Sequence, residues 1–239
     1  MTTVLLAHVR RHCTSRSVKS LIAARVPIAG HLRRGMARVG MLRACALAVV
    51  FALSPAYAQE EAPVHAQSAP RVLVQTSMGS FVIALNPQRA PLTVANFLEY
   101  VRAGHYDGTI FHRVVGNFIV QGGGYDQNYV ERPTRPDVPN ESGNGLSNLR
   151  GSVGLARAGD AHSGDAQFYI NIADNAMLDP QPSRWGYAVF GQVVEGMRVV
   201  DDIGAVATGE VGPFDRDAPL KPIVIERVEE LPGDRGTAP

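Results

Sequence analysis

The sequence predicts an all-β dominated fold, either a sandwich or a closed barrel, for most of the chain. Three observations carry this prediction: eight short runs of strand-forming residues, glycine-rich connections between them, and no regular alternation of strands with helices. Only two segments have the apolar spacing of a helix. With 45% hydrophobic and 19% charged residues among 239, the composition is that of one globular domain with tails.

The domain is expected to begin with a β-hairpin followed by a helix. The runs 72–76 and 80–85 are rich in β-branched residues, and Ser77-Met78-Gly79 between them is typical of a turn. Pro91 suits a first helical turn, and Gly104 ends the helical pattern. Four apolar residues lie between them at i, i+3, i+4 and i+7: Val94, Phe97, Leu98 and Val101. This amphipathic helix is expected to cover one face of the sheet.

Residues 106–123 predict two further strands that carry polar groups on a shared face. Side chains alternate along an extended chain, so Phe111, Arg113 and Val115 lie on one side of the first strand. Gly116-Asn117 then turns the chain, which returns Phe118 and Gln121 beside Arg113 on the neighbouring strand. An arginine beside apolar surface suits a neutral carbonyl ligand.

The second half of the domain contains a long connection and four more strands. Residues 122–149 hold five glycines and three prolines, which predicts an ordered loop, and long loops in compact domains are usually functional. A short helix is expected near residues 197–203. The remaining strand-like runs are Ser152–Arg157, Gln167–Ile172, Val189–Val194 and Ile223–Val228.

The charge is distributed unevenly along the chain. Residues 1–58 hold nine of the 23 Lys and Arg and none of the 22 acidic residues, so the remainder carries a net charge of −8. Such an acidic body lacks the clustered Lys and Arg that neutralise phosphates. We therefore expect no nucleic-acid partner.

The N-terminal 58 residues predict a leader with a secretory signal peptide. Met41-Leu42-Arg43 is followed by an apolar run, Ala44–Leu53, and by the small-x-small site Ala56-Tyr57-Ala58. Cleavage is expected after Ala58. The mature protein is expected to work in a periplasm. A membrane span needs roughly 20 apolar residues, so no stable membrane insertion is expected. Residues 1–35 are either a transit-like segment or a misassigned start before Met36 or Met41.

The predicted organisation after the leader has three parts. Residues 59–70 are polar, Ala/Pro-rich and without periodicity, which predicts a flexible tether. Residues 71–231 form the folded domain, and residues 232–239 a disordered tail. Both cysteines, Cys13 and Cys45, lie in the leader, so the predicted mature protein has no disulfide.

The central stretch resembles the signature of the cyclophilin family of peptidyl-prolyl cis-trans isomerases. That signature is an aromatic residue, Phe-His-Arg, two aliphatic residues and then Phe-aliphatic-x-Gln-Gly-Gly, and it matches residues 106–123 here. Three further segments match the family: Leu155–Ala158, Ala166–Asn171 and Tyr187–Gly191. The resemblance implies an eight-stranded closed antiparallel β-barrel capped by two α-helices, which agrees with the strand count. It also implies a cofactor-free monomer that acts on proline-containing segments of unfolded or folding proteins.

The resemblance also assigns the site residues. The catalytic set is Arg113, Phe118 and Gln121. The substrate-binding set is His112, Ile119, Ala156, Arg157, Gln167, Tyr169, Met177, Leu178 and Tyr187, with Arg157 contributing its backbone. Three of these depart from the common eukaryotic form, because Tyr169 replaces a phenylalanine, Met177 a tryptophan and Tyr187 a histidine. His112 by itself is typical of a structural histidine. It has no Asp or Cys at the spacing of metal ligands, so no metal site is predicted.

The chemistry expected of this set is stabilisation of a twisted imide. Resonance makes rotation about an X–Pro bond slow, and a guanidinium aimed at the imide nitrogen stabilises the lone pair that localises there. The main alternative is a non-catalytic peptide-binding or chaperone module that uses the same groove. Retention of Arg113, Phe118 and Gln121 together favours the enzyme. A carbohydrate-binding or structural barrel would have needed exposed aromatic residues instead.

Overall fold

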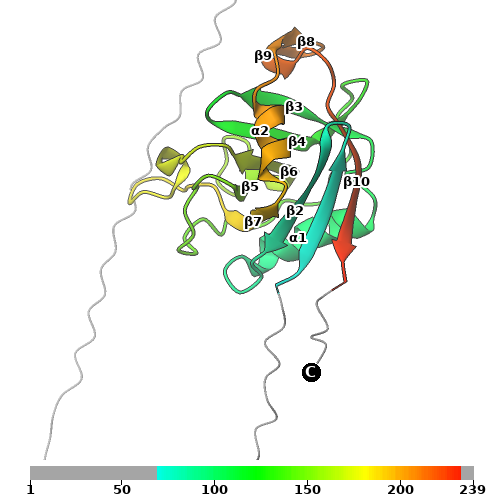
Figure 1. Cartoon of the computed structure of the whole chain (residues 1–239). Helices are drawn as coiled ribbons and strands as arrows, with labels where there is room; N and C mark the ends of the chain where they lie inside the picture. The colour runs from blue at the N-terminus through cyan, green and yellow to red at the C-terminus, as the bar shows by residue number, and fades with distance from the viewer. Residues whose placement is uncertain (1–68, 233–239) are drawn as a thin grey trace, which may run out of the picture. The chain divides into compact units, whose positions relative to one another are not determined.

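Eight strands close into an antiparallel barrel, which decides between the sandwich and the barrel in favour of the fold that the family resemblance implied (Figure 1). The computed structural model describes residues 69–232, so the predicted leader, most of the tether and nearly all of the tail lie outside the described residues. The strands follow the order β1-β10-β3-β4-β6-β5-β7-β2, and all neighbours pair antiparallel. Their bounds are β1 Arg71–Thr76, β2 Gly79–Leu85, β3 Thr109–Val115, β4 Ile119–Asp126, β5 Ser152–Arg157, β6 Gly164–Asn171, β7 Val189–Glu195 and β10 Val224–Leu231.

The barrel is filled by residues that alternate along its strands. In β1, Val72 and Val74 are fully buried while their neighbours are partly exposed, as the two-residue period of a strand requires. Phe97 of the first helix packs among three core aromatic rings, with ring centroids 5.1 to 5.7 Å away. The partners of Phe97 are Tyr106, Phe168 and Phe190.

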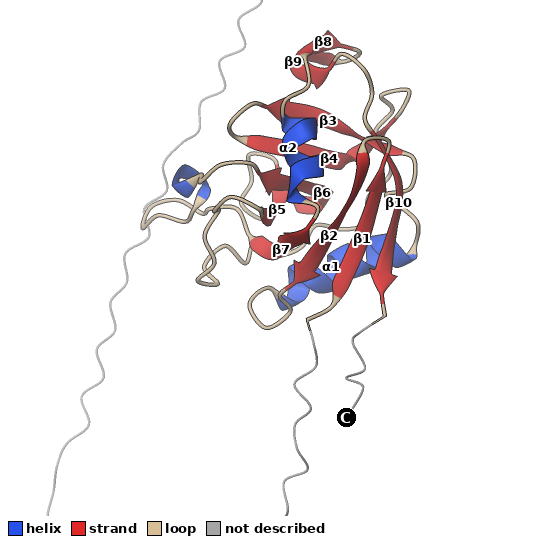
Figure 2. Cartoon of the chain, viewed as in Figure 1, coloured by secondary structure: helices blue, strands red, loops and turns tan. Residues whose placement is uncertain are grey.

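Both predicted helices are present, α1 (Pro91–Arg102) and α2 (Met197–Gly204) (Figure 2). α1 packs on β10 and β6, and α2 packs on β2, β3 and β4. The first turn of α1 lacks a side-chain cap of its own, and Glu141 of the long loop supplies one. Its carboxylate accepts from Leu92 N at 3.1 Å and Thr93 N at 2.8 Å, which also suits the helix dipole. No described helix is long and apolar enough to cross a bilayer.

The predicted loop at 122–149 begins too early. Residues 122–126 belong to β4, and the irregular connection runs from there to β5. The three consecutive glycines suggested a loop, but they lie in β4. Glycine is needed at these strand positions because the neighbouring side chains leave no room for a Cβ. A Cβ on Gly122 would lie 2.7 Å from Phe111, and a Cβ on Gly124 would lie 2.6 Å from Gln167.

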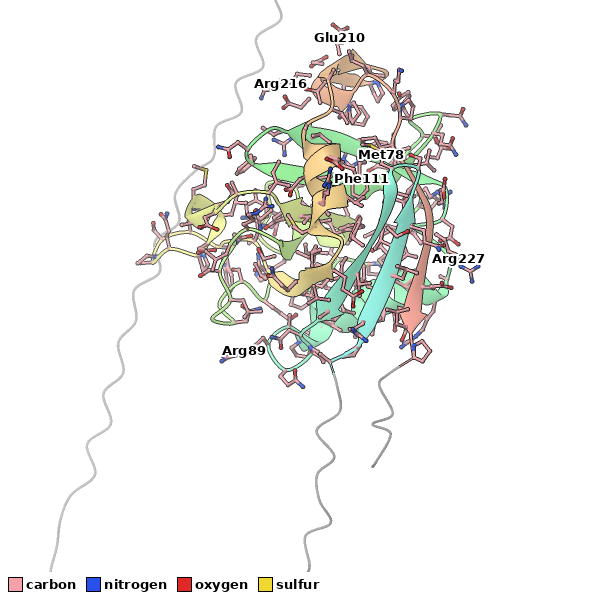
Figure 3. All side chains as sticks on the ribbon, in the orientation of Figure 1. Met78, Arg89, Phe111, Glu210, Arg216 and Arg227 are labelled. Atoms are coloured by element: carbon pink, nitrogen blue, oxygen red, sulfur yellow. The ribbon has the colours of Figure 1, made fainter. Side chains whose placement is uncertain are left out.

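A two-stranded hairpin outside the barrel, β8 (Thr208–Val211) and β9 (Phe214–Pro219), was missed by the sequence analysis. Its polar, glycine-containing sequence shows no clear alternation, and its attachment is tertiary: β9 packs on β3. Phe214 stacks on His112 with ring centroids 5.4 Å apart and meets Tyr125 edge-on at 5.0 Å. Figure 3 shows the side chains of Glu210 and Arg216 pointing away from the barrel at the end of this hairpin.

The burial of His112 predicts a pH-dependent loss of stability. Burial and then the neighbouring Arg113 lower the pKa of His112 to about 4, below the unfolded value of about 6.5. The unfolded state therefore binds the proton first, so the contribution is fully present above about pH 6.5 and is lost as the pH falls toward about 4. The expected loss is roughly 3 kcal/mol in the free energy of unfolding.

Urea unfolding at about pH 7 and about pH 4.5 checks this expectation. His112→Phe keeps a stacked ring but cannot titrate, so its stability should fall less over this range than that of the wild type. Equal pH dependence in the two proteins would contradict the assignment to His112.

Candidate active site

The register of β3 against β4 brings the predicted polar groups together. Arg113 lies directly opposite Gln121, as the strand pattern predicted. Arg113 Nη1 donates a hydrogen bond to Gln121 Oε1 at 3.3 Å, and Gln121 Nε2 donates to Gln167 Oε1 of β6 at 3.1 Å. Each of the three side chains is half-buried. The two hydrogen bonds run in one direction, from Arg113 to Gln121 and from Gln121 to Gln167, and this series orients the guanidinium relative to the sheet.

A cavity of about 200 Å³ with an apolar inner wall, called the apolar pocket below, opens at this polar row. Its buried wall is Ile119, Ala156 and Tyr169, and half-buried side chains complete it. The full lining is Arg113, Phe118, Ile119, Gln121, Ala156, Arg157, Tyr169, Leu178 and Tyr187. The site therefore combines two guanidinium groups, those of Arg113 and Arg157, with an apolar inner wall, where the low local dielectric strengthens their field.

Tyr169 forms the inner wall of this pocket. Its side chain is 2% exposed, and its hydroxyl donates to Asn148 Oδ1 at 2.6 Å. Desolvation by burial raises the pKa of Tyr169, so the hydroxyl stays protonated and acts as a donor. Gly154 on the adjacent strand makes room for the ring, because a Cβ there would collide with Cζ and Oη of Tyr169.

The side chain of Arg157 makes contacts that the sequence analysis did not predict. Its guanidinium lies 4.4 Å from the centroid of the Tyr187 ring, a cation–π arrangement. It also donates to the carbonyl oxygens of Trp185 at 3.1 Å and Gly186 at 3.3 Å. These contacts hold the segment before β7 against β5, which places Tyr187 at the pocket.

Two of the predicted substrate-binding residues lie at the edge of the site. Gln167 lines a neighbouring cavity of about 300 Å³, which shares its lining residues Gln121, Ala156 and Arg157 with the apolar pocket. Met177 belongs to the short 3-10 helix η1 (Ala176–Leu178) and is 67% exposed. It does not line the pocket, although the adjacent Leu178 does.

The structure does not bring His112 to the groove. A register shift between Phe111 and Arg113 interrupts the alternation of β3, so Phe111 lies in the core and, contrary to the sequence prediction, does not share a face with the half-buried Arg113. His112 is 4% exposed and packs against Phe214 and Tyr125. His112 does not line the pocket, so the structure gives no support to its assignment to the substrate-binding set.

Sequence reasoning missed the buried amides behind the pocket. Asn148 and Asn171 are fully buried, and Asn175 is 6% exposed. Asparagine in a sequence is typical of turns and surfaces rather than of core positions, so these residues carried no signal of a site. Among residues 69–232, no group of three or more His, Cys, Asp or Glu side chains could hold a metal ion.

The crowding at Gly154 generates a prediction. Gly154→Ala should push the Tyr169 ring into the pocket and weaken the affinity for a short Ala-Pro peptide by roughly tenfold or more, since overpacking costs about 1–3 kcal/mol. Calorimetric titration measures this. Gly159→Ala is the matched control, because a Cβ there meets nothing within 4 Å. Equal peptide affinities of the two variants would contradict the role given to Gly154.

Comparisons with known proteins agree with this fold and show the family. A family model described as "Cyclophilin type peptidyl-prolyl cis-trans isomerase/CLD" matches residues 71–230. The "Peptidyl-prolyl cis-trans isomerase A" of Dickeya dadantii is 49% identical over 175 residues, which cover 73% of this chain and 88% of the relative. The "Peptidyl-prolyl cis-trans isomerase B" of Escherichia coli is 44% identical over 160 residues, covering 66% and 97% respectively.

A solved structure adds support for the fold. The crystal structure of a cyclophilin type peptidyl-prolyl cis-trans isomerase from Cryptosporidium parvum matches with a TM-score of 0.57 and 22% identity, covering 69% of this chain and 99% of that one. At this identity the likeness shows the fold alone. The family model and the bacterial relatives show more: the chain belongs to the cyclophilin-type peptidyl-prolyl cis-trans isomerase family.

Proposed function

We propose that this domain accelerates rotation about X–Pro bonds in folding proteins, and that Arg113 stabilises the twisted imide. The observation that carries the proposal is the position of the Arg113 guanidinium at the rim of the apolar pocket, where Gln121 orients it. Within residues 69–232 Arg113 forms no ion pair, so its charge is available to a ligand.

The physical basis is the resonance of the imide. Rotation has a barrier of about 20 kcal/mol because the nitrogen lone pair is delocalised into the carbonyl. When the bond twists, the lone pair localises on nitrogen, and a guanidinium N–H donates to it. The pocket around Ile119 and Tyr169 would hold the proline ring while the carbonyl end rotates. No proton transfer and no nucleophile are needed.

The second candidate is a peptide-binding or chaperone module that uses the same groove without turnover. The pocket alone would serve both functions, since it holds a proline ring in either case. The oriented guanidinium favours catalysis, because a binding module gains nothing from a group aimed at the twisted state.

Replacement of Arg113 separates the two candidates. Arg113→Ala should lower kcat/KM for an Ala-Pro peptide by roughly tenfold or more, which corresponds to about 1.4 kcal/mol of lost transition-state stabilisation. A protease-coupled isomerisation assay measures it. The control is Arg198→Ala on α2, whose side chain is 93% exposed and forms only an i,i+4 contact with Asp202 at 4.0 Å.

The outcomes are distinct. A folded Arg113→Ala protein with wild-type kcat/KM would refute the arginine mechanism. A wild-type protein that binds the peptide but does not accelerate its isomerisation would support the non-catalytic module.

We also propose that the protein is exported as a monomer to a periplasm and begins at Gln59. The support is the basic leader without acidic residues, the apolar run of about ten residues and the small residues Ala56 and Ala58. N-terminal sequencing of protein from the periplasmic fraction should give Gln59. A start at Met1, or a product confined to the cytoplasm, would contradict the export proposal, and size-exclusion chromatography tests the monomer.

A further inference from the structure

A cluster of buried polar side chains lies directly behind the apolar pocket. Asn148 and Asn171 are fully buried, Ser152 is 2% exposed and Asn175 is 6% exposed. The four residues come from the long loop, the end of β6, the start of β5 and the turn before η1. Burying four polar side chains is costly unless each finds partners, and all four do.

Asn148 is the centre of this cluster. Its Oδ1 accepts from Tyr169 Oη at 2.6 Å and from Asn171 Nδ2 at 3.2 Å. Its Nδ2 and its backbone N–H both donate to Asp179 Oδ1, each at 2.8 Å. With two donors facing the amide oxygen and a carboxylate facing the amide nitrogen, only one orientation of the side chain satisfies every partner.

The same cluster reaches the other walls of the pocket. Asn175 Nδ2 donates to the carbonyl oxygen of Phe118 at 2.9 Å and to Asn171 Oδ1 at 2.7 Å. The backbone of Asn175 donates to Asn148 O and accepts from Leu178 N, both at 2.8 Å. Asn148 is therefore linked to three walls of the pocket. It bonds directly to Tyr169, and it reaches Phe118 and Leu178 through Asn175.

We propose that Asn148 is the positioning residue of the proline pocket and acts through the hydroxyl of Tyr169. The hydroxyl gives this ring an anchor that a phenylalanine at the same place would lack. Asn148 touches no substrate, because it is fully buried behind the ring. The predicted effect on KM rests on the proposed function, whereas the positioning of Tyr169 concerns only the shape of the pocket.

The expected kinetic consequence is specific. The pocket holds the proline ring equally in the ground state and in the twisted state, so loosening its wall weakens both states to the same extent. Loss of such uniform binding raises KM and leaves kcat almost unchanged. A residue with only a structural role would instead lower the unfolding temperature and leave KM of the folded protein unaltered.

The test is a double-mutant cycle with Tyr169→Phe, Asn148→Ala and the double variant. Each single change should raise KM for an Ala-Pro peptide by roughly three- to tenfold, the value of one hydrogen bond, with kcat within about twofold. Both changes remove the same contact. The fold-increase in KM of the double variant should therefore be smaller than the product of the two single fold-increases.

Tyr106→Phe is the matched control. Tyr106 is also a buried tyrosine, 1% exposed, whose hydroxyl donates to a carbonyl, Ala166 O at 2.8 Å, but it does not line the pocket. It should lower stability and leave KM unchanged. If Asn148→Ala does not fold, the comparison of Tyr169→Phe with Tyr106→Phe decides.

A Tyr169→Phe protein with the KM of the wild type, or single effects that multiply in the double variant, would overturn the proposal. Calorimetric Kd values for the same peptide carry the same comparison without turnover. A wild type that binds the peptide but does not isomerise it would refute the proposed function. The calorimetric test would then decide this inference: a rise in Kd as predicted supports it, and an unchanged Kd refutes it.

Discussion

The antiparallel register of β3, β4 and β6 is the constraint on which the site depends. It sets Arg113 opposite Gln121 and Gln121 opposite Tyr169, so cation, amide and pocket wall lie in one row across three strands. Side chains alternate along a strand, and a slip of one residue would turn Gln121 into the core and bring a buried valine to the groove. Closure of the barrel by β1 and β10 removes the free edges that would allow such a slip.

The site divides its work between a polar row and an apolar pocket. The guanidinium of Arg113 supplies a permanent charge, while Ile119, Ala156 and Tyr169 supply a surface without charge. Each needs the other, because a cation exposed to bulk water has a weak field and an apolar pocket alone has no preference for a twisted bond. Arg157 contributes indirectly by holding Tyr187 in place through a cation–π contact.

The long loop before β5 is structural at one end and functional at the other. Glu141 supplies the missing cap of α1, and Asn148 lies behind the pocket wall. A segment without helix or strand must satisfy its polar groups with side chains, and this loop does so with asparagine and aspartate partners such as Asn144 and Asp179. The same hydrogen bonds that order the loop therefore reach the pocket.

Local patterns in the sequence determined most of the barrel strands, both helices and the meeting of Arg113 with Gln121, because these features depend on neighbours only eight or fewer residues apart. Only the tertiary structure decided the rest. The attachment of the hairpin β8–β9 to β3, the burial of His112 beneath Phe214, and the bond from Tyr169 to Asn148 join residues 21 or more positions apart. No periodicity records such pairs, since they exist only after the barrel closes and brings distant polar and aromatic groups into one dry interior.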